Sequence, residues 1–422
     1  MNRVSLSVLI ALALLSGPSS AQGRRAACPP DNAGLTLPPG FCALVVAESV
    51  GRARHLVVAP NGDVFVALRV RRDTPAGVLA LRDTSGDGVA DVRRRFGPDS
   101  GGTGIALHGG YLYFATDQAV VRWVWGAGQL EPVGPPDTIV RDLVSRRQHA
   151  AKSIAIRPQD SSLFVNIGAP SNACQEQDRT AGSKGQDPCP LLAEAGGIWR
   201  FDVARRGQTQ ADGERFATGL RNTLALAVDP GTGVLFGAQH GRDQLNAFWP
   251  QLYTVEQSAE KPAEELFLLV RGGDYGWPYC YYDPEVGAKL LAPEYGGDGR
   301  TAGRCASARS PEIAFPAHWA PEAMVFYTGS QFPSSYRGGL FISFHGSWNR
   351  APLPQAGFNV SFVGFARGRP APGYNVFADG FAGADTGTAA HRPMGLAVGP
   401  DGSLYVSDDA GGRIYRIIYR GN

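Results

Sequence analysis

Histidine, arginine and amide side chains occur just before or after strand-like stretches of this 422-residue chain. In FISFHGSWNR, residues 341–350, alternating side chains predict a half-buried strand that ends in His345, Trp348, Asn349 and Arg350. An imidazole can transfer protons near neutral pH, and a guanidinium can bind carboxylates. A polar turn is the plain alternative. Gathered in one concave site, such residues indicate acid–base chemistry on a polar ligand.

A hairpin motif recurs along the chain: an apolar strand, a turn with Pro, Gly or Asp, and a second apolar strand. Its copies start at Val57, Ile105, Ile154, Leu226, Met324 and Leu396, which lie 48, 49, 72, 98 and 72 residues apart. A unit near this size is typical of a four-stranded propeller blade. The sequence therefore predicts an all-β fold, a six-bladed β-propeller of four-stranded antiparallel blades. A tandem pair of β-domains and a β-solenoid are the alternatives.

Residues 1–21 predict a secretory signal peptide, because a positive residue precedes an apolar stretch and a small-residue cleavage pattern that ends at Ala21. Residues 22–422 are expected to form a single propeller domain with loop insertions near 170–190 and 241–320. No later segment is long and apolar enough to predict a membrane span, so we expect a soluble, periplasmic or secreted protein. A net charge of +2 gives no sign of a nucleic-acid partner.

The six cysteines indicate disulfides, since an exported chain matures in an oxidising compartment. None of them forms a CxxC motif, which argues against thiol-redox chemistry and a structural zinc site. Fifteen pairings exist for six cysteines. The simplest joins Cys28 with Cys42, Cys174 with Cys189, and Cys280 with Cys305.

The residues that flank the hairpins should form one ring. The residue before the first strand of a hairpin and the residue after its second strand lie at the same end, and all blades of a propeller point the same way around the channel. The flanking residues are His55, Gln148, His149, Arg221, Asn222, Gln239, His240, His318, Trp319, His345, His391, Arg392, Asp408 and Asp409. Six of the seven histidines belong to this ring. We expect the functional site at this mouth of the channel.

Several motifs resemble the glucose/sorbosone dehydrogenase family, whose members are soluble, periplasmic six-bladed propellers that use pyrroloquinoline quinone (PQQ). They are GLRNTLALAVDP (219–230), AQHGRDQL (238–245), GGDYGWPYCY (272–281), FHGSWNR (344–350) and RPMGLAVGPDGSLYVSDDAGGRIYRI (392–417). The resemblance runs from about residue 35 to the C-terminus. It fits the sorbosone-type branch better than the glucose-type branch.

The resemblance implies PQQ and Ca²⁺ as cofactors. PQQ is a planar ortho-quinone with three carboxylates, so it requires cations, a flat slot and a polarising ion. The family motifs place cofactor contacts at Arg221, Asn222, Gln239, His345 and Arg392, and calcium at the backbone carbonyls of His240 and Gly241.

The resemblance also implies a mechanism, in which His149 is the general base and Arg221 helps to stabilise the developing oxyanion. His149 would take the proton of the substrate hydroxyl while hydride passes from the same carbon to the quinone. Gln148 and Trp319 would contact the substrate. The implied substrate is an aldose, sorbosone or a related aldehyde or alcohol, with electrons passing to a periplasmic acceptor. A homodimer is left open.

Three positions depart from the glucose-type branch. Gln148 replaces an acidic residue, Met394 stands at the place of a second cofactor arginine, and residues 102–105 have no glutamine nearby. Glucose is therefore not the expected substrate. The alternative function is a propeller without the quinone, either a lactonase-like hydrolase or a carbohydrate- or protein-binding module. Arg221, Gln239 and Arg392 together favour the dehydrogenase, because a lactonase requires converging metal ligands and not cations around a tricarboxylate.

Three further stretches have competing interpretations. Asp83–Val92, DTSGDGVADV, resembles a calcium loop but lacks the glutamate at its twelfth position, so a glycine-rich hairpin turn is expected. Glu264 and Glu265 are either exposed or help to position calcium or sugar hydroxyls. Residues 175–189 are expected to form a long surface loop, tied by its disulfide, that overhangs the site.

Overall fold

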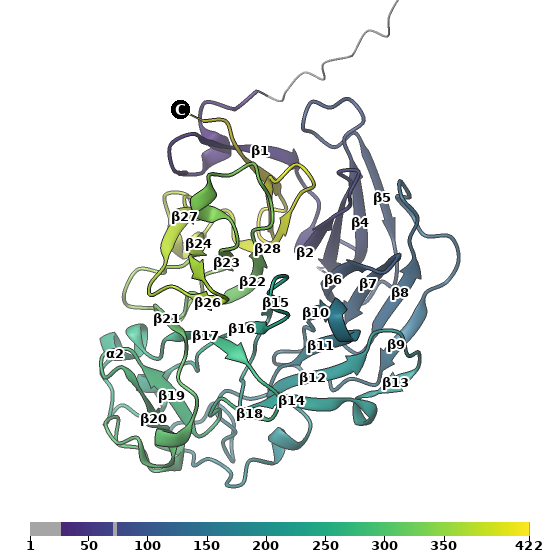
Figure 1. Ribbon diagram of the computed structural model, residues 1–422. Coiled ribbons are helices and arrows are strands. Elements are labelled where there is room, and N and C mark those ends of the chain that lie inside the picture. The colour runs from purple at the N-terminus through teal and green to yellow at the C-terminus, as the bar shows by residue number, and fades with distance from the viewer. Residues whose placement is uncertain (1–26, 71–73, 422) are drawn as a thin grey trace, which may run out of the picture.

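The computed structural model describes residues 27–70 and 74–421 and confirms the six-bladed β-propeller (Figure 1). The predicted signal peptide lies outside the described residues. The six inner strands surround a central channel. They are β2 (Arg52–Val58), β6 (Gly102–His108), β10 (Ile154–Arg157), β15 (Ala225–Val228), β22 (Pro321–Phe326) and β28 (Pro393–Val398).

The first three blades follow the chain outward from the channel in antiparallel order. Blade one adds β3 (Val64–Arg69), β4 (Gly77–Arg82) and β5 (Val92–Phe96) to β2; blade two adds β7 (Tyr111–Thr116), β8 (Val120–Val124) and β9 (Asp137–Arg141) to β6; blade three adds β11 (Ser162–Ile167), β12 (Gly197–Asp202) and β14 (Glu214–Thr218) to β10. The short strands β13 (Gln208–Thr209) and β18 (Gly273–Asp274) pair in parallel with the outer strands of blades two and three.

The last three blades follow the same plan, except that strand order in the final blade is completed from the other end of the chain. Blade four adds β16 (Leu235–Gln239), β17 (Glu264–Leu269) and β21 (Ile313–Phe315) to β15; blade five adds β23 (Leu340–Phe344), β24 (Asn359–Val363) and β27 (Asn375–Ala378) to β22; blade six adds β29 (Leu404–Asp408), β30 (Ile414–Tyr419) and β1 (Phe41–Ala47) to β28. A small hairpin, β25 (Phe365–Ala366) and β26 (Arg369–Pro370), follows β24.

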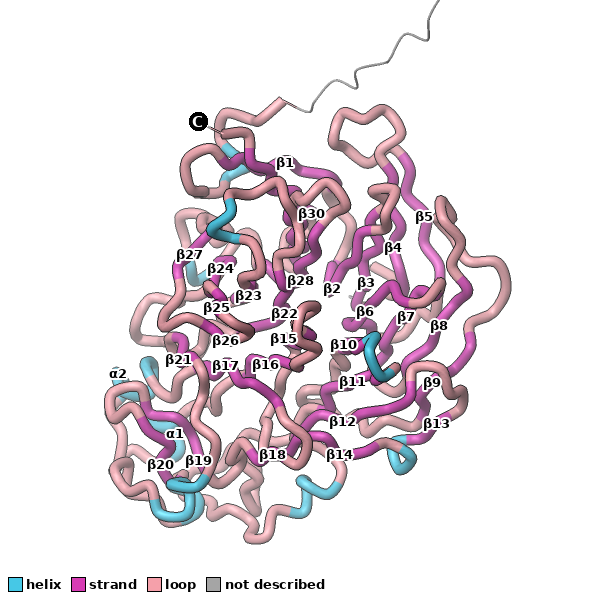
Figure 2. The backbone as a smooth tube through the Cα atoms, viewed as in Figure 1, coloured by secondary structure: helices cyan, strands magenta, loops and turns pink. Residues whose placement is uncertain are grey.

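The burial of each strand follows from its place in the blade. β3, VFVALR, is buried on both faces because neighbouring blades cover both, and its β-branched and aromatic residues suit this position. The outer strand β5, VRRRF, instead exposes three consecutive arginines. Charged side chains on an edge strand oppose pairing with another chain. Figure 2 shows that strands and loops make up nearly all of the described chain.

The connections on either side of β17 carry both α-helices of the described chain and a separate hairpin. α1 (Leu245–Phe248) and α2 (Val255–Glu260) lie between β16 and β17. The hairpin of β19 (Cys280–Asp283) and β20 (Ala288–Leu291) lies between β17 and β21, and these elements lie together outside the ring of blades (Figure 1). None of the helices within the described residues has the length and apolarity needed to cross a membrane.

All three predicted disulfides are confirmed. Cys28 is bonded to Cys42, Cys174 to Cys189, and Cys280 to Cys305. The second closes the loop that begins after β11, and the third ties β19 to the segment that follows β20. Closing a loop of 15 residues stabilises a fold by about 3 kcal/mol in the chain-entropy account.

The segment Asp83–Val92 is the turn between β4 and β5, as expected. The Asp83 carboxylate accepts hydrogen bonds from the backbone N–H groups of Gly86 and Gly88. The Asp91 carboxylate likewise accepts from the N–H groups of Thr84 and Ser85. The loop thus uses both carboxylates to hold its own backbone.

Strand β1 closes the ring by pairing with β30, so the N-terminal segment supplies the outer strand of the last blade. Phe41 lies opposite Tyr419, and its ring meets those of Phe332, Tyr336 and Phe377 at centroid distances of 4.8–5.5 Å. Aromatic edge-to-face pairs of this kind add to the stability gained from burial. Phe41 therefore fastens the closing strand to blade five.

We predict that Phe41→Ala lowers the free energy of unfolding by about 3–5 kcal/mol, because it leaves a cavity where the ring closes. The measurement is chemical denaturation followed by tryptophan fluorescence. Val124→Ala is the matched control, since the Val124 side chain is 67% exposed and its loss should change stability by less than about 0.5 kcal/mol. Equal effects of the two substitutions would contradict the role given to Phe41.

Candidate active site

The predicted base, His149, lies before β10 with its backbone in the left-handed region, at φ +51°. Its Nδ1 donates a hydrogen bond to the carbonyl oxygen of Ala169 at 2.5 Å, which leaves Nε2 as the acceptor nitrogen of a neutral ring. Nε2 has no hydrogen-bond partner among the residues that the structure describes. Burial, aided by the nearby Arg221 guanidinium, lowers the pKa of His149 to about 3. The imidazole is therefore an uncharged, half-buried proton acceptor.

Residues 168 and 169, at the end of β11, connect His149 to Arg221. The backbone N–H of Ala169 donates to the Arg221 carbonyl oxygen at 2.7 Å, while its carbonyl oxygen accepts from His149. A Cβ atom on Gly168 would lie 2.6 Å from the His149 Cβ and 2.8 Å from the Asn222 Oδ1. Only glycine allows this close approach. It brings His149 and Arg221 to the same side of the channel mouth.

Arg221 is 3% exposed, and the protein already engages most of its guanidinium. Nη1 donates to the Gly241 carbonyl oxygen at 2.9 Å, and Nη2 donates to Asn172 Oδ1 at 3.1 Å and to Asp243 Oδ2 at 2.7 Å. Its Nε is buried without a hydrogen-bond partner among the described residues. The arginine is thus fixed in orientation, with one donor left unused.

Two predicted cofactor residues, Gln239 and Asn222, are also buried on this side of the mouth. Gln239 Oε1 accepts from the backbone N–H of Arg221 at 3.0 Å, and its Nε2 donates to Glu265 Oε1 at 2.8 Å. Asn222 Oδ1 accepts from Asn166 Nδ2 at 3.2 Å. Both side chains therefore hold the backbone and neighbours of Arg221 in place.

Asp243 is a site residue that the sequence analysis quoted within AQHGRDQL but gave no role. Its Oδ2 accepts from Arg221 and, at 2.8 Å, from Arg179 Nη2. Its Oδ1 accepts from Asn349 Nδ2 at 2.7 Å. Burial alone would raise the pKa of Asp243, but Arg221 and Arg179 hold it well below its usual range. One carboxylate thus joins three segments at the mouth, including the end of FISFHGSWNR.

Gln148, a predicted substrate contact, is held by the loop 175–189. Its Nε2 donates to Asp178 Oδ2 at 2.7 Å, and its Oε1 accepts from Arg179 Nε at 3.2 Å. The loop therefore reaches the residue that precedes His149.

A second group of charges joins blades five, six and one, which are consecutive around the ring. Arg54 Nη1 donates to Asp409 Oδ2 at 2.7 Å, and its Nη2 lies 3.4 Å from Glu322 Oε2. The predicted calcium-site residue His240 donates from its Nε2 to the Pro321 carbonyl oxygen at 2.9 Å. Arg54 and Glu322 are both buried, and the sequence analysis assigned neither a role.

His345 belongs to this second group. Its Nε2 lies 2.6 Å from Asp409 Oδ1, and its Nδ1 lies 3.2 Å from the Gly346 carbonyl oxygen. Burial alone would lower the pKa of His345, but the Asp409 carboxylate raises it above 6.5. Both ring nitrogens of His345 face acceptor oxygens, an arrangement that a doubly protonated, positively charged ring satisfies.

Arg392 and Trp319 are two further predicted contacts, and both are half-buried. Arg392 Nη1 donates to the Gly346 carbonyl oxygen at 3.3 Å, and its guanidinium lies 5.2 Å from the centroid of the Phe358 ring. Within the described residues it forms no ion pair. Trp319 is half-buried and packs edge-on against Phe344 and Tyr374.

The interpretation of Glu264 and Glu265 as exposed residues is wrong, because their side chains are 2–3% exposed. Both lie on β17, the third strand of blade four. Glu264 Oε2 accepts from the Gly241 N–H at 2.7 Å, and Glu265 Oε2 lies 2.7 Å from Lys289 Nζ. Burial raises the pKa of Glu264, although the Gly241 and Ala320 N–H groups oppose this.

The remaining ring histidines bond to neighbouring groups. His318 Nε2 lies 2.9 Å from the Ser258 carbonyl oxygen, and His391 Nδ1 lies 2.7 Å from Asp408 Oδ2. His55 lies 2.9 Å from the Glu322 carbonyl oxygen, a contact between blades and not within its own turn.

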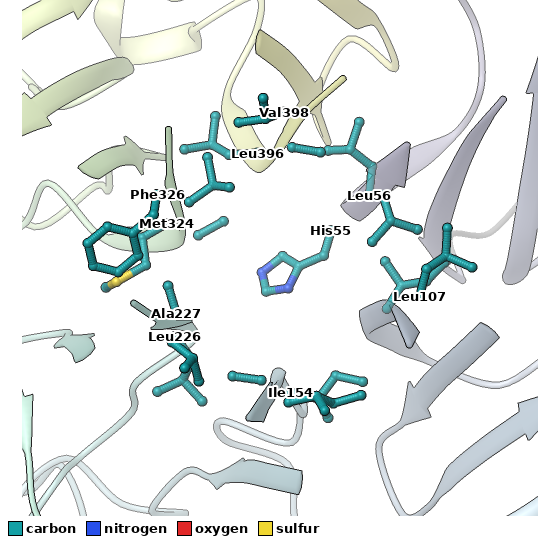
Figure 3. Close-up of a pocket in the computed structure, with 18 of the residues that line it drawn as sticks. His55, Leu56, Leu107, Ile154, Leu226, Ala227, Met324, Phe326, Leu396 and Val398 are labelled. Carbon is teal, nitrogen blue, oxygen red and sulfur yellow. The ribbon is translucent and has the colours of Figure 1, made fainter. Parts of the chain in front are cut away.

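His55 also marks the border between the polar mouth and an apolar channel. Figure 3 shows its ring pointing into a cavity of about 420 Å³ within the channel. Burial, with a smaller contribution from Arg54, lowers the pKa of His55 to about 4. Around it lie Leu56, Leu107, Ile154, Leu226, Met324 and Leu396, with at least one residue from each inner strand. The half of the channel near the hairpin turns therefore offers few groups for acid–base chemistry. Such groups lie at the other mouth.

A metal at this mouth would depend on backbone oxygens. The described part of the chain has no group of three or more His, Cys, Asp or Glu side chains placed to bind an ion. The carbonyl oxygens of His240 and Gly241 remain as donors, and that of Gly241 already accepts from Arg221. Oxygen donors of this kind, completed by water or ligand oxygens, suit a hard cation such as Ca²⁺.

Comparison with known proteins gives relatives of low identity and solved structures of closely similar shape. The TrAA12-like family matches residues 35–420. An uncharacterized protein of Borreliella burgdorferi is 28% identical over 278 residues, covering 65% of this chain and 61% of that protein. The pyrroloquinoline quinone-dependent pyranose dehydrogenase of Coprinopsis cinerea is 25% identical over 361 residues, covering 74% of this chain and 46% of that protein. The chain thus spans about half to three-fifths of the length of these relatives.

Two solved structures share the fold. The calcium structure of the Trichoderma reesei Carbohydrate-Active Enzymes Family AA12 protein has a TM-score of 0.73 at 19% identity, covering 94% of this chain and 99% of that one. The holo form of the Coprinopsis cinerea pyranose dehydrogenase PQQ domain has the same TM-score and identity, covering 91% and 97%.

We predict that His345→Gln costs more stability at about pH 6 than at about pH 9. The folded pKa of His345 lies above 6.5, so its pairing with Asp409 contributes stability that is fully present below 6.5 and is lost as the pH rises through the raised pKa. Urea denaturation of the wild type and the variant at both pH values measures the difference. His108→Gln is the control, since His108 forms no ion pair among the described residues. If His345→Gln lowers the free energy of unfolding equally at both pH values, the charged His345–Asp409 pair is contradicted.

Proposed function

Since the chain belongs to the TrAA12-like family, we propose that it is a PQQ-dependent oxidoreductase that oxidises an aldose, sorbosone or a related aldehyde or alcohol. The protein is related to PQQ-dependent sugar dehydrogenases, among them the pyranose dehydrogenase of Coprinopsis cinerea. The observation that carries the proposal is the neutral imidazole of His149, whose Nε2 has no partner among the described residues and lies at the mouth that also holds Arg221.

The residues at the mouth fit a tricarboxylate cofactor. Arg392 has no carboxylate partner among the described residues, and Arg221 retains a buried Nε without a hydrogen bond. A carboxylate would pair with the Arg392 guanidinium through charge-assisted hydrogen bonds. We propose that Arg392, Arg221 and the charged His345 hold PQQ, and that the carbonyls of His240 and Gly241 bind Ca²⁺. When bound, the ortho-quinone supplies the hydride acceptor.

Gln239 and Asn222 support this site indirectly. Their side chains fix the backbone around Arg221, so we propose that they shape the cofactor pocket through that arginine. Gln148 and Trp319 are proposed to contact the substrate, since both are half-buried at the same mouth.

His149 is proposed to accept the proton of the substrate hydroxyl at Nε2. The Nδ1–H···O=C bond to Ala169 fixes the tautomer that presents a lone pair, and it also stabilises the imidazolium that forms. Asp243 favours that charged ring by its negative potential. Arg221 disfavours the charged ring, so the imidazole stays neutral until it accepts the proton.

The hydrolase alternative receives less support from the mouth. Asp243 and Asp409 are each bonded to arginines, and Glu264 accepts two backbone N–H groups. These carboxylates serve the protein and do not converge as metal ligands among the described residues. Three disulfides support a periplasmic or secreted location, where an electron acceptor would take up the electrons.

We predict that the calcium-loaded protein binds PQQ stoichiometrically and reduces a dye with at least one sugar or aldehyde from a panel of aldoses, sorbosone and simple aldehydes. Absorbance titration measures binding, and dye bleaching measures turnover. His149→Ala should lower kcat by about 10²–10⁴-fold, the usual contribution of a general base. His108→Ala, which alters a histidine outside the mouth, should leave it unchanged. No binding at micromolar PQQ would turn the search to hydrolysis or ligand binding.

We further predict that kcat/KM shows no acid limb near pH 6.5. The pKa of His149 is about 3, so the base stays deprotonated throughout the range from about pH 5 to about pH 8. Initial rates over this range in buffers of constant ionic strength test the prediction. An acid limb near pH 6.5 would mean that burial and Arg221 do not lower the pKa of His149.

A further inference from the structure

The loop closed by the Cys174–Cys189 disulfide grips the residue that precedes the proposed base. Asp178 Oδ2 accepts from the amide nitrogen of Gln148 at 2.7 Å, and Arg179 Nε donates to the amide oxygen at 3.2 Å. Two consecutive loop residues thus hold both ends of one amide. Any displacement of the loop would move Gln148, and with it the adjoining His149.

The same guanidinium also holds the counter-ion of Arg221. Arg179 Nη2 donates to Asp243 Oδ2 at 2.8 Å, and Nη1 donates to Gln244 Oε1 at 2.9 Å. Asp243 in turn binds Arg221 at 2.7 Å. All three kinds of nitrogen in the Arg179 fork are therefore used, and each reaches a residue outside the loop.

The loop itself fixes the place of Arg179. Its backbone adopts the left-handed conformation, at φ +55°, and its N–H donates to Gln175 Oε1 at 2.9 Å. The Gln175 amide nitrogen bonds the carbonyl oxygens of Thr180 and Ser183 at 3.1 and 3.2 Å. Gly185 is bonded through its N–H to the insertion at Glu294. A non-glycine residue keeps such a backbone only where its surroundings determine it.

We propose that Arg179 is a positioning residue, which sets the His149 segment at a fixed distance from the Arg221–Asp243 pair. The inference rests on the proposed function for its effect on turnover. The role needs a planar fork, because three acceptors in different directions must be met at once. A lysine ammonium at the end of a flexible stem cannot reach all three with the same geometry. The loop thus acts on the reaction without touching the reacting atoms.

The test compares Arg179→Ala and Arg179→Lys with Arg205→Ala, a control in which an arginine of blade three loses an ion pair with Asp212. We expect Arg179→Ala to lower kcat/KM at least about tenfold, mainly in kcat, because a misplaced base slows the chemical step. Arg179→Lys should recover only part of this loss. Arg179→Ala and Arg205→Ala should both remain folded at the assay temperature, which circular dichroism checks.

A second readout does not depend on turnover. The ring resonances of His149, assigned by comparison with His149→Gln, should shift in Arg179→Ala and stay in place in Arg205→Ala. If the wild type fails to bind PQQ, the proposed function fails, while a shifted His149 resonance still upholds the positioning role. Wild-type kcat/KM in Arg179→Ala, an unmoved His149 resonance, or full activity in Arg179→Lys would each overturn the proposal.

Discussion

Two carboxylates with little exposure at the channel mouth, Asp409 and Asp243, are each held by cations from other parts of the ring. Asp409, from blade six, is bonded to Arg54 of blade one and His345 of blade five. Asp243 likewise joins Arg221 to the Arg179 loop. Removing one partner from such a pair leaves a buried charge uncompensated, at a cost of about 3–5 kcal/mol. These ion pairs form only when neighbouring blades are correctly placed. The geometry of the site therefore depends on the closed ring of blades.

The backbone at the mouth is as specialised as its side chains. Five non-glycine residues there adopt positive φ angles of 51–63°: His149, Arg179, Gln244, His318 and Ala320. Each such residue turns the chain sharply, so that segments between strands present side chains inward and leave carbonyl oxygens available as acceptors. A left-handed conformation at a non-glycine residue costs about 1–3 kcal/mol and persists where surrounding contacts require it. Here those contacts are the hydrogen bonds that hold the proposed base and Arg221.

The blades were predictable because a hairpin is local: VVAPNGDVFV and LAVGPDGSLYV each contain their own turn and both strands. The disulfides were predictable for the same reason, since each joins cysteines at most 25 residues apart. The partners within the site were not. Asn349 and Asp243 are separated by 106 residues, and no local pattern announces their contact. Glu264 and Glu265 were misjudged because composition cannot show that Lys289 and the Gly241 N–H lie opposite them.

The pairing of β1 with β30 also determines when the ring can close during synthesis. A ribosome adds about 5–20 residues per second, so β1 leaves it on the order of tens of seconds before its partner exists. Until Ile414–Tyr419 appears, the Phe41–Ala47 strand has no strand to pair with, and blade six lacks the strand next to its outer one. Open edges invite wrong pairing with other chains. Completion of the ring must therefore be a late, long-range event, and a chain shortened at its C-terminus by a single strand would leave the N-terminal strand without its place.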